Sequence, residues 1–377
     1  MSVVKLVTQN FRNLNHKPID LHPSLNFFIG DNGSGKSSLL EAIFYLGHGK
    51  SFRTSKTDLL ATYSKDQFVV SVKDNLDSQL GIARNVNSSL TQIKIDGVRQ
   101  AKLSILAKHI AVQIVTPESF KLFFGGPKER RRFVDLGMFH VKHDFSEQWK
   151  SFNRVLKQRN ACLKIGTNDK NLVYWTEQLD QHSQKVTELR RAYVNTLSAE
   201  LDYWIAILLP DLSDKITVQF LQGWPMAKSL AESFAQNSER EFSFGFSLYG
   251  AHKFDVKFLV DKQVIETKLS RGQQKLFLLA LTFTQAKLIE RVNRVKPILL
   301  IDDIGAELDF NSRSLLSKAI KELNCQVIIT AIEKSVLKPF FDDVVMKNLN
   351  LSTDISTNNN NDEKYKVFHV KHGAVSH

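Results

Sequence analysis

The sequence predicts an α/β protein whose parallel sheet is interrupted by an inserted helical hairpin. A β-prone run, Leu25–Ile29, leads through a glycine-rich turn into apolar residues at helical spacing over Lys36–Leu46. Helical and buried-strand patterns alternate between residues 273 and 329, as parallel sheets require. Between these regions, residues 145–208 repeat apolar side chains at steps of three and four, which is typical of two long helices.

Short strands and one helix are expected before the insertion. The helix over Lys36–Leu46 should end at Gly47, because glycine commonly caps helix C-termini. The strands are predicted from runs rich in β-branched and aromatic residues. They are Val3–Val7, Leu25–Ile29, Gln67–Val72, Ile93–Ile95 and Val112–Val115.

The character of the chain changes after the glycine-rich segment 125–127. Apolar positions from Phe145 to Leu163 fit one helical face. A longer pattern runs from Leu172 to Leu208 and stops before Pro210, since proline does not continue a helix. A turn near Gly166–Asn168 should make these two helices antiparallel.

Strands and helices alternate after the hairpin. The expected strands are Ile216–Leu221, Phe242–Leu248, Asp255–Val260, Ile298–Ile301 and Val327–Ile329, and the expected helices are Gln273–Leu288 and Ser312–Leu323. The resulting organisation has residues 1–124 and 241–377 as two parts of one α/β domain. Residues 125–240 form a helical arm inserted between them.

Composition limits the classes of function. Of the 377 residues, 42% are hydrophobic, so the chain can bury a sizeable core. The net charge of +12 indicates a polyanionic partner, either nucleic acid or an anionic membrane surface. Two distant cysteines favour a reducing compartment, and the longest apolar run, residues 203–209, is too short for a membrane span. We expect a soluble, cytoplasmic protein without a membrane segment.

A phosphate-binding loop follows the strand Leu25–Ile29. Residues 30–37 match G-x-x-x-x-G-K-[ST], a pattern whose glycines let backbone N–H groups close around phosphates. The helix that begins near Lys36 directs its N-terminal dipole at the same place. Lys36 is expected to reach the β- and γ-phosphates of ATP, and Ser37 to join the shell of a Mg²⁺ ion. The predicted ATP-binding residues are Gly30, Asp31, Asn32, Gly33, Ser34, Gly35, Lys36 and Ser37.

Two adjacent carboxylates follow a second buried strand. The aliphatic run Ile298–Ile301 ends at Asp302 and Asp303, and ligands lie at the carboxyl ends of parallel strands. Asp302 is therefore expected to hold Mg²⁺, directly or through water. Asp303 is the candidate catalytic residue that orients or deprotonates the attacking water. The alternative is that the pair only marks a strand leaving the core into a turn.

A third segment, Leu269–Lys275, opens a strongly apolar helix. Taken alone, Ser270 before a glycine is ordinary helix capping. The three segments in this order resemble the ABC-type ATPase heads, where the third is the signature motif that binds the γ-phosphate held by the other subunit. The resemblance assigns Ser270, Arg271, Gly272 and Gln273 to the signature and Asp309 to the D-loop. Thr330 departs from the pattern, because ABC transporters usually have a switch histidine there.

The chain is more closely similar to the RecF family of SMC-like ATPases. The additional motifs are QNFRN at 9–13, GKSFRT at 49–54, TPE at 116–118, GGPKERRRFVD at 125–135, QRN at 158–160 and GAHK at 250–253. This resemblance implies an ATP-dependent homodimer that hydrolyses ATP slowly as a switch and binds single-stranded or gapped DNA. It also implies that the protein acts with RecO and RecR to load RecA, with roles in replication and the SOS response.

Basic residues gather near the start of the insertion. Arg130, Arg131 and Arg132 are candidates for DNA contact, because such a cluster neutralises backbone phosphates. The alternative is that some of these arginines pair with carboxylates inside the protein and position the arm. The resemblance also suggests that Arg12 and Arg53 contact the nucleotide, with an ordinary surface charge as the alternative for each. Gln113 is a candidate Q-loop glutamine that senses Mg²⁺.

Two other functions share parts of this pattern. The ATP-binding subunit of an ABC-type transporter has the same motif order, although it does not explain the inserted basic helices or Thr330. A small-molecule phosphotransferase shares the phosphate loop and has no need of the Ser270 segment. The sequence favours an ATP-switched, DNA-binding repair protein over both.

Overall fold

The computed structural model describes residues 2–88, 90–142, 144–166, 170–293, 296–305, 308–341 and 365–377. The chain divides into two compact units. Unit 1 comprises residues 1–119 and 271–377, and unit 2 comprises residues 120–270. The turn predicted near Gly166–Asn168 lies partly outside the described residues.

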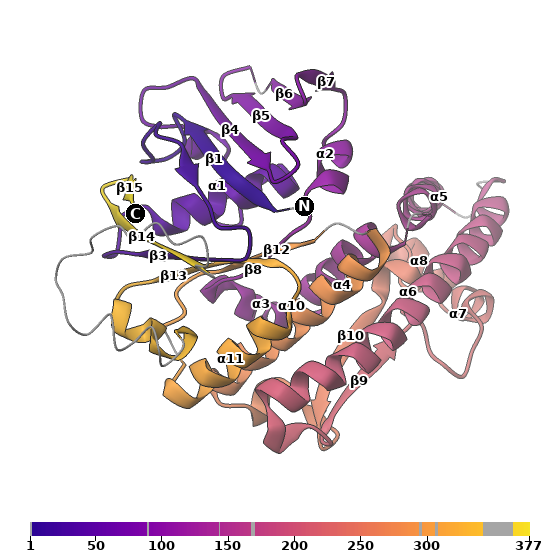
Figure 1. Ribbon diagram of the computed structural model, residues 1–377. Helices are drawn as coiled ribbons and strands as arrows, with labels where there is room; N and C mark the ends of the chain where they lie inside the picture. Colours follow the sequence, from indigo (N-terminus) through magenta and orange to yellow (C-terminus); the bar gives the residue numbers. More distant parts are fainter. Residues whose placement is uncertain are drawn as a thin grey trace. The chain divides into compact units, whose positions relative to one another are not determined.

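Unit 1 contains two sheets on either side of helix α1 (Lys36–His48), which contacts strands of both (Figure 1). The antiparallel sheet has the strand order β2 (Ile19–Asp20), β1 (Val3–Gln9), β4 (Gln67–Asp74), β5 (Gln79–Asn85), β6 (Thr91–Ile95) and β7 (Val98–Gln100). The second sheet is parallel except for one edge strand. Its order is β15 (Ala374–Ser376), β14 (Tyr365–Lys371), β3 (Leu25–Ile29), β13 (Gln326–Ala331), β12 (Ile298–Ile301) and β8 (Val112–Val115).

The core of unit 1 fixes α1 against both sheets. Between α1 and the antiparallel sheet, the ring of Phe68 meets Phe11 and Tyr45 edge to face at centroid distances of 5.3 and 5.2 Å. Such aromatic contacts add to the stabilisation from buried area. Helices α10 (Arg271–Asn293) and α11 (Phe310–Glu322) cover the opposite face of the parallel sheet, and α2 (Leu103–His109) packs on α1 (Figure 1).

The end predicted for α1 was wrong by two residues. The helix passes through Gly47 and ends at Gly49, which has a φ of 63° and caps the last turn. A Cβ on Gly47 would lie 2.7 Å from Cγ2 of Val112 in β8. Gly47 therefore serves close helix–sheet packing instead of helix termination.

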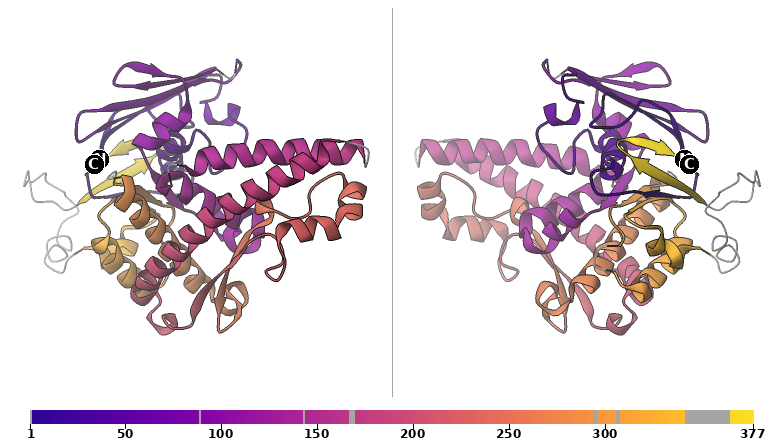
Figure 2. Two further views of the ribbon diagram at one scale, coloured as in Figure 1. Left: turned by 90° about the vertical axis from the view of Figure 1, so that its right-hand side faces the viewer. Right: turned by 90° about the vertical axis from the view of Figure 1, so that its left-hand side faces the viewer.

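Unit 2 is built on a pair of long helices, α5 (Phe145–Ile165) and α6 (Leu172–Leu208), which pack side by side (Figure 2). A small antiparallel sheet has the order β11 (Gln263–Val264), β10 (Asp255–Val260) and β9 (Ile216–Leu221). The remaining helices are α3 (Lys121–Phe124), α4 (Pro127–Val141), α7 (Leu230–Gln236), α8 (Ser238–Phe244) and α9 (Ile265–Lys268). Across the described residues, no helix combines the length and apolarity needed to cross a membrane.

The strand predicted over Phe242–Leu248 was also wrong. The segment forms the end of α8 and a turn at Gly245, which has a φ of 68°. Buried Glu241 explains this local structure, because its carboxylate accepts a hydrogen bond from the Leu248 N–H at 2.7 Å. A buried carboxylate that needs such partners overrides the β propensity of the aromatic residues around it.

Candidate nucleotide-binding site

The phosphate loop, residues 30–37, joins β3 to α1 and supplies the backbone of the site. Gly33 and Gly35 have φ values of 79° and 116°, a region that glycine enters at little cost. Gly35 is the N-cap of α1, so the first N–H groups of the helix are presented at the loop. This backbone is suited to binding a phosphate group.

Lys36 folds back across the loop. Its Nζ donates hydrogen bonds to the carbonyl oxygens of Gly30 at 2.6 Å and Asp31 at 2.9 Å. Burial lowers the pKa of Lys36, while the charges of Asp302, Asp303 and Asp31 act in the opposite direction. The ammonium group is thus held at the loop by neutral acceptors, and phosphate oxygens are stronger ones.

Ser37 and Asp302 meet although 265 residues separate them in the sequence. The Ser37 hydroxyl donates to the Asp302 carboxylate oxygens, with distances of 3.0 and 3.2 Å. Thr330 Oγ1 donates to Asp302 Oδ1 at 2.7 Å from the neighbouring parallel strand. Oxygen ligands of this kind suit Mg²⁺, so the residues present fit that ion.

Asp303 has an unusual backbone conformation, with a φ of 51°. Its N–H donates to Thr330 Oγ1 at 2.8 Å, and its carbonyl oxygen accepts from Lys275 Nζ at 2.8 Å. Its side-chain Oδ1 is buried and has no hydrogen-bond partner among the described residues. The backbone of Asp303 is therefore fixed by its neighbours in unit 1.

The signature segment and the D-loop are next to helix N-termini. Ser270 is the last residue of unit 2, and residues 271–273 form the first turn of α10 in unit 1. Asp309 is the N-cap of α11 and accepts a hydrogen bond from the Ser312 N–H at 2.7 Å, which lowers the pKa of Asp309. Asp309 thus has a capping role within one chain. Roles of both segments across a dimer stay predictions.

Glu41 is a buried residue of α1 that sequence reasoning missed. Its carboxylate accepts two hydrogen bonds of 2.8 Å from Arg12 and a short one from the Ser51 hydroxyl. Arg53 Nη1 lies 3.8 Å from the same carboxylate. The signal was a glutamate within an apolar helical run. The two arginines suggested as nucleotide contacts are thus gathered on one carboxylate of the helix that follows the loop.

Gln113 is placed away from the strand end where Asp302 lies. It is buried in β8 opposite Leu299, three residues before the position of Asp302, which corresponds to about 10 Å along a strand. Its side-chain Nε2 has no hydrogen-bond partner in the part of the chain that the structure describes. A role for Gln113 at Mg²⁺ stays a prediction.

The three arginines proposed for DNA contact have different environments. Arg130 is buried and donates to both carboxylate oxygens of Asp255 at 2.8 and 2.9 Å, and this hydrogen bonding raises the pKa of Arg130. Arg131 Nη1 donates to the Phe254 carbonyl oxygen at 3.1 Å. Arg132 is exposed, with Glu129 at 3.7 Å. The structural alternative is favoured for Arg130, and DNA contact by the other two stays a prediction.

Comparisons with known proteins define the class. Residues 2–350 match the model of the RecF/RecN/SMC N-terminal domain. A crystal structure of an Smc head bound to the winged-helix domain of ScpA aligns with 90% of this chain and 92% of that one, at 18% identity and a TM-score of 0.54. Together with the phosphate loop and Asp302, these matches define the ATPase head of an SMC-like protein.

Within this class, the chain belongs to the RecF family. It is 64% identical over 375 residues to "DNA replication and repair protein RecF" of Colwellia psychrerythraea, covering all of this chain and 97% of that protein. The solved structure of the recombination mediator protein RecF–ATP in the RecFOR pathway aligns with all of this chain and 97% of that one, at 22% identity and a TM-score of 0.80. The predicted family and the predicted ABC-type head with a helical insertion are confirmed.

Proposed function

We propose that this chain is an ATP-binding protein of DNA replication and repair that binds single-stranded or gapped DNA. The observation that carries the proposal is the meeting of Ser37 with Asp302 beside the phosphate loop. Its relatives are named for DNA replication and repair, and a structure with the same fold is a RecF–ATP complex. Family membership does not favour the transporter alternative.

In this proposal the loop backbone and Lys36 hold the triphosphate of ATP. Ser37 and Asp302 hold Mg²⁺, which neutralises negative charge on the phosphates when it is bound. Asp303 supplies the carboxylate that orients the attacking water, since its charge acts on Lys36 and it shares the Thr330 hydroxyl with Asp302. Slow hydrolysis of the bound ATP then ends the ATP-bound state, so that hydrolysis acts as a switch.

The switch requires two copies of the chain. The Ser270 segment of one copy closes on the γ-phosphate held by the other, so ATP brings the heads together. The closed dimer retains DNA, with Arg131 and Arg132 on backbone phosphates. Hydrolysis releases the DNA, and the protein works in the cytoplasm with RecO and RecR to promote RecA loading and SOS induction.

Sedimentation velocity tests the proposal with and without ATP–Mg²⁺, each with and without gapped DNA. ATP should shift the protein from monomer to dimer, and only the dimer should carry DNA. Ser270→Arg should retain ATP binding and remain monomeric, because it blocks closure and leaves the phosphate loop intact. A stable ATP-bound monomer that does not bind DNA would contradict the proposal. Binding to anionic vesicles in place of DNA would favour the transporter alternative.

A further inference from the structure

The hairpin formed by β14 and β15 lies beside the phosphate loop. Strand β14 pairs in parallel with β3, the strand that leads into the loop. The turn residues His372 and Gly373 have φ values of 47° and 78°, the positive pair typical of a type I′ turn. The Gly373 N–H donates to the Ser34 carbonyl oxygen at 2.7 Å, and its own carbonyl accepts from the Asn15 N–H at 3.0 Å.

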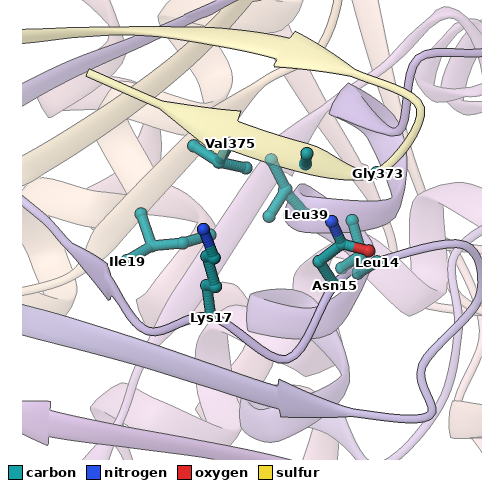
Figure 3. Close-up of a pocket in the computed structure, with 8 residues that line it drawn as sticks. Leu14, Asn15, Lys17, Ile19, Leu39, Gly373 and Val375 are labelled. Carbon is teal, nitrogen blue, oxygen red and sulfur yellow. The ribbon is translucent and has the colours of Figure 1, made fainter.

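The contact leaves no room for a side chain at the turn. A Cβ on Gly373 would overlap the carbonyl oxygen of Asn13. A Cβ on Gly35, in the loop, would lie 3.3 Å from the Gly373 Cα, and one on Gly30 would strike the Val370 carbonyl oxygen. The hairpin therefore touches the phosphate loop near both of its ends. Figure 3 shows Gly373 and Val375 of the hairpin close to Leu14, Asn15 and Leu39.

The hydrogen bond from Gly373 has a direct effect on the direction of a loop N–H group. In a planar trans peptide the carbonyl of one residue and the N–H of the next point in opposite directions. Holding the Ser34 carbonyl on the hairpin therefore aims the Gly35 N–H away from the hairpin. We infer that Gly373 is a positioning residue that fixes the phosphate loop in its nucleotide-binding conformation, an inference that rests on the proposed ATP binding.

The antiparallel sheet contains a matched control turn. Asp96 and Gly97 connect β6 to β7 with φ values of 49° and 80°, nearly those of His372 and Gly373. A Cβ on Gly97 would meet no atom of the described residues within 4 Å. Alanine imposes the same backbone strain at both glycines. Only at Gly373 does it also strike the backbone of Asn13, whose side-chain amide donates to the Gly33 carbonyl of the phosphate loop at 3.5 Å.

The test compares Gly373→Ala with Gly97→Ala, at a temperature where both are folded. Titration with a fluorescent ATP analogue should show affinity about tenfold weaker for Gly373→Ala and changed less than about twofold for Gly97→Ala, since tenfold corresponds to the loss of one to two hydrogen bonds. Hydrogen exchange without nucleotide should speed up over residues 30–38 in Gly373→Ala alone. Equal affinities and equal exchange in the two variants would overturn the inference.

Val375→Ala covers the case in which Gly373→Ala does not fold. Val375 packs on the core without positive φ, so its truncation loosens the hairpin gently. A two- to threefold loss of affinity, with faster exchange over residues 30–38, is expected. This is less than the cost of two fully buried methyl groups, because Val375 is only partly buried. Unchanged exchange would overturn the inference. Wild-type protein that binds no ATP, with exchange altered as expected, would instead contradict the proposed function.

Discussion

The nucleotide-site edge of unit 1 and the core of unit 2 use charged residues in opposite ways. At the site edge, Lys36 is held by neutral carbonyls, and Asp303 keeps a buried oxygen without a hydrogen-bond partner among the described residues. In unit 2, buried arginines are matched to carboxylates. The pairs are Arg130–Asp255, Arg159–Glu241 and Arg190–Asp135. At the site edge, Lys36 can exchange neutral acceptors for a charged ligand, whereas the matched ion pairs of unit 2 hold the fold.

Arg190 shows how complete the pairing in unit 2 is. Its guanidinium donates two hydrogen bonds of 3.0 Å to Asp135 and one of 2.6 Å to the Ala251 carbonyl. The rings of Phe254 and Trp149 lie 3.7 and 4.6 Å from its Cζ, so the remaining faces are covered as well. Burial lowers the pKa of Arg190 to about 10, still far above neutral pH. This cation is therefore unavailable to DNA.

The largest expected effect is on the stability of unit 2. Arg159 contacts Glu241, Ser247 and Thr176 at 2.6, 2.7 and 3.0 Å, so Arg159→Met leaves the buried Glu241 carboxylate without its cation. The variant should lose about 3–5 kcal/mol of unfolding free energy, measured by urea denaturation. Arg154→Met, on the exposed side of the same helix, is the control and should change stability by less than about 0.5 kcal/mol. Equal unfolding free energies for Arg159→Met and Arg154→Met would contradict the view that the matched ion pairs of unit 2 hold its fold.

The converse experiment is made at the phosphate loop. Lys36→Ala should weaken ATP binding at least about 100-fold, roughly 3 kcal/mol, because the ammonium group that now donates to the Gly30 and Asp31 carbonyls is the proposed charge-assisted donor to the phosphates. Calorimetric titration measures this loss, and the unfolding free energy without nucleotide should change by less than about 1 kcal/mol. Lys65→Ala, at an exposed lysine of unit 1, should bind ATP normally. Retained binding in Lys36→Ala would show that the loop does not hold the triphosphate.

Local patterns predicted much of the fold, and long-range polar partners were the main omission. The apolar pattern from Leu172 to Leu208, with its end placed at Pro210, predicted α6, because the period is sustained over the 37 residues of the helix. The pairing of Ser37 with Asp302 also followed from a rule, since parallel strand ends share one edge. The partner of Arg159 lies 82 residues away, and no periodicity reports such a contact.

The absence of distant partners from local patterns also explains why the sequence left two roles open for the basic cluster near the arm, DNA contact and internal pairing. Arg130 and Arg132 are two positions apart and have similar sequence surroundings, yet one is buried on Asp255 and the other is exposed. The contact of Gly373 with the phosphate loop was not predicted, because it depends on β14 pairing with β3. Charge and turn residues thus become informative about function only when their distant neighbours are known.

A smaller effect is expected from acid, and it should fall on unit 2. Burial lowers the pKa of His252 to about 4, and that of His140 likewise to about 4. The unfolded chain therefore binds more protons than the folded one between about pH 6.5 and 4, so stability is full above this window and falls as pH decreases through it. At pH 5, His252 should account for about 2 kcal/mol of loss.

His252→Gln tests this contribution, since a glutamine amide can keep a hydrogen bond to the Ser247 carbonyl and does not titrate. Denaturation measured from pH 7.5 to 5 should show a smaller loss of unfolding free energy for the variant than for the wild type. The loss that remains includes the contribution of His140. The nucleotide affinity of unit 1 should be unaffected at pH 7.5. An unchanged slope would mean that His252 is not kept neutral by the fold.

The smallest effect is expected at Thr330, whose hydroxyl both donates and accepts a hydrogen bond at the site edge. Its hydroxyl donates to Asp302 Oδ1 and accepts from the Asp303 N–H, so it holds the carboxylate that faces Ser37. Thr330→Val keeps the shape and removes both hydrogen bonds. The Mg²⁺ concentration needed for half-maximal ATP binding should rise about tenfold, about 1.4 kcal/mol, which is typical of one lost hydrogen bond.

Two further measurements separate positioning from general destabilisation. ATP affinity without Mg²⁺ should be the same for Thr330→Val and wild type, because the Thr330 hydroxyl bonds Asp302 and Asp303, whereas Lys36 bonds the loop carbonyls of Gly30 and Asp31. Thr330→Ser retains the hydroxyl and should need nearly the wild-type Mg²⁺ concentration. If valine and serine behave alike, the hydroxyl does not organise Asp302, and the threonine is only a buried residue of β13. If only valine raises the Mg²⁺ requirement, the hydrogen bonds of Thr330 belong to the nucleotide site.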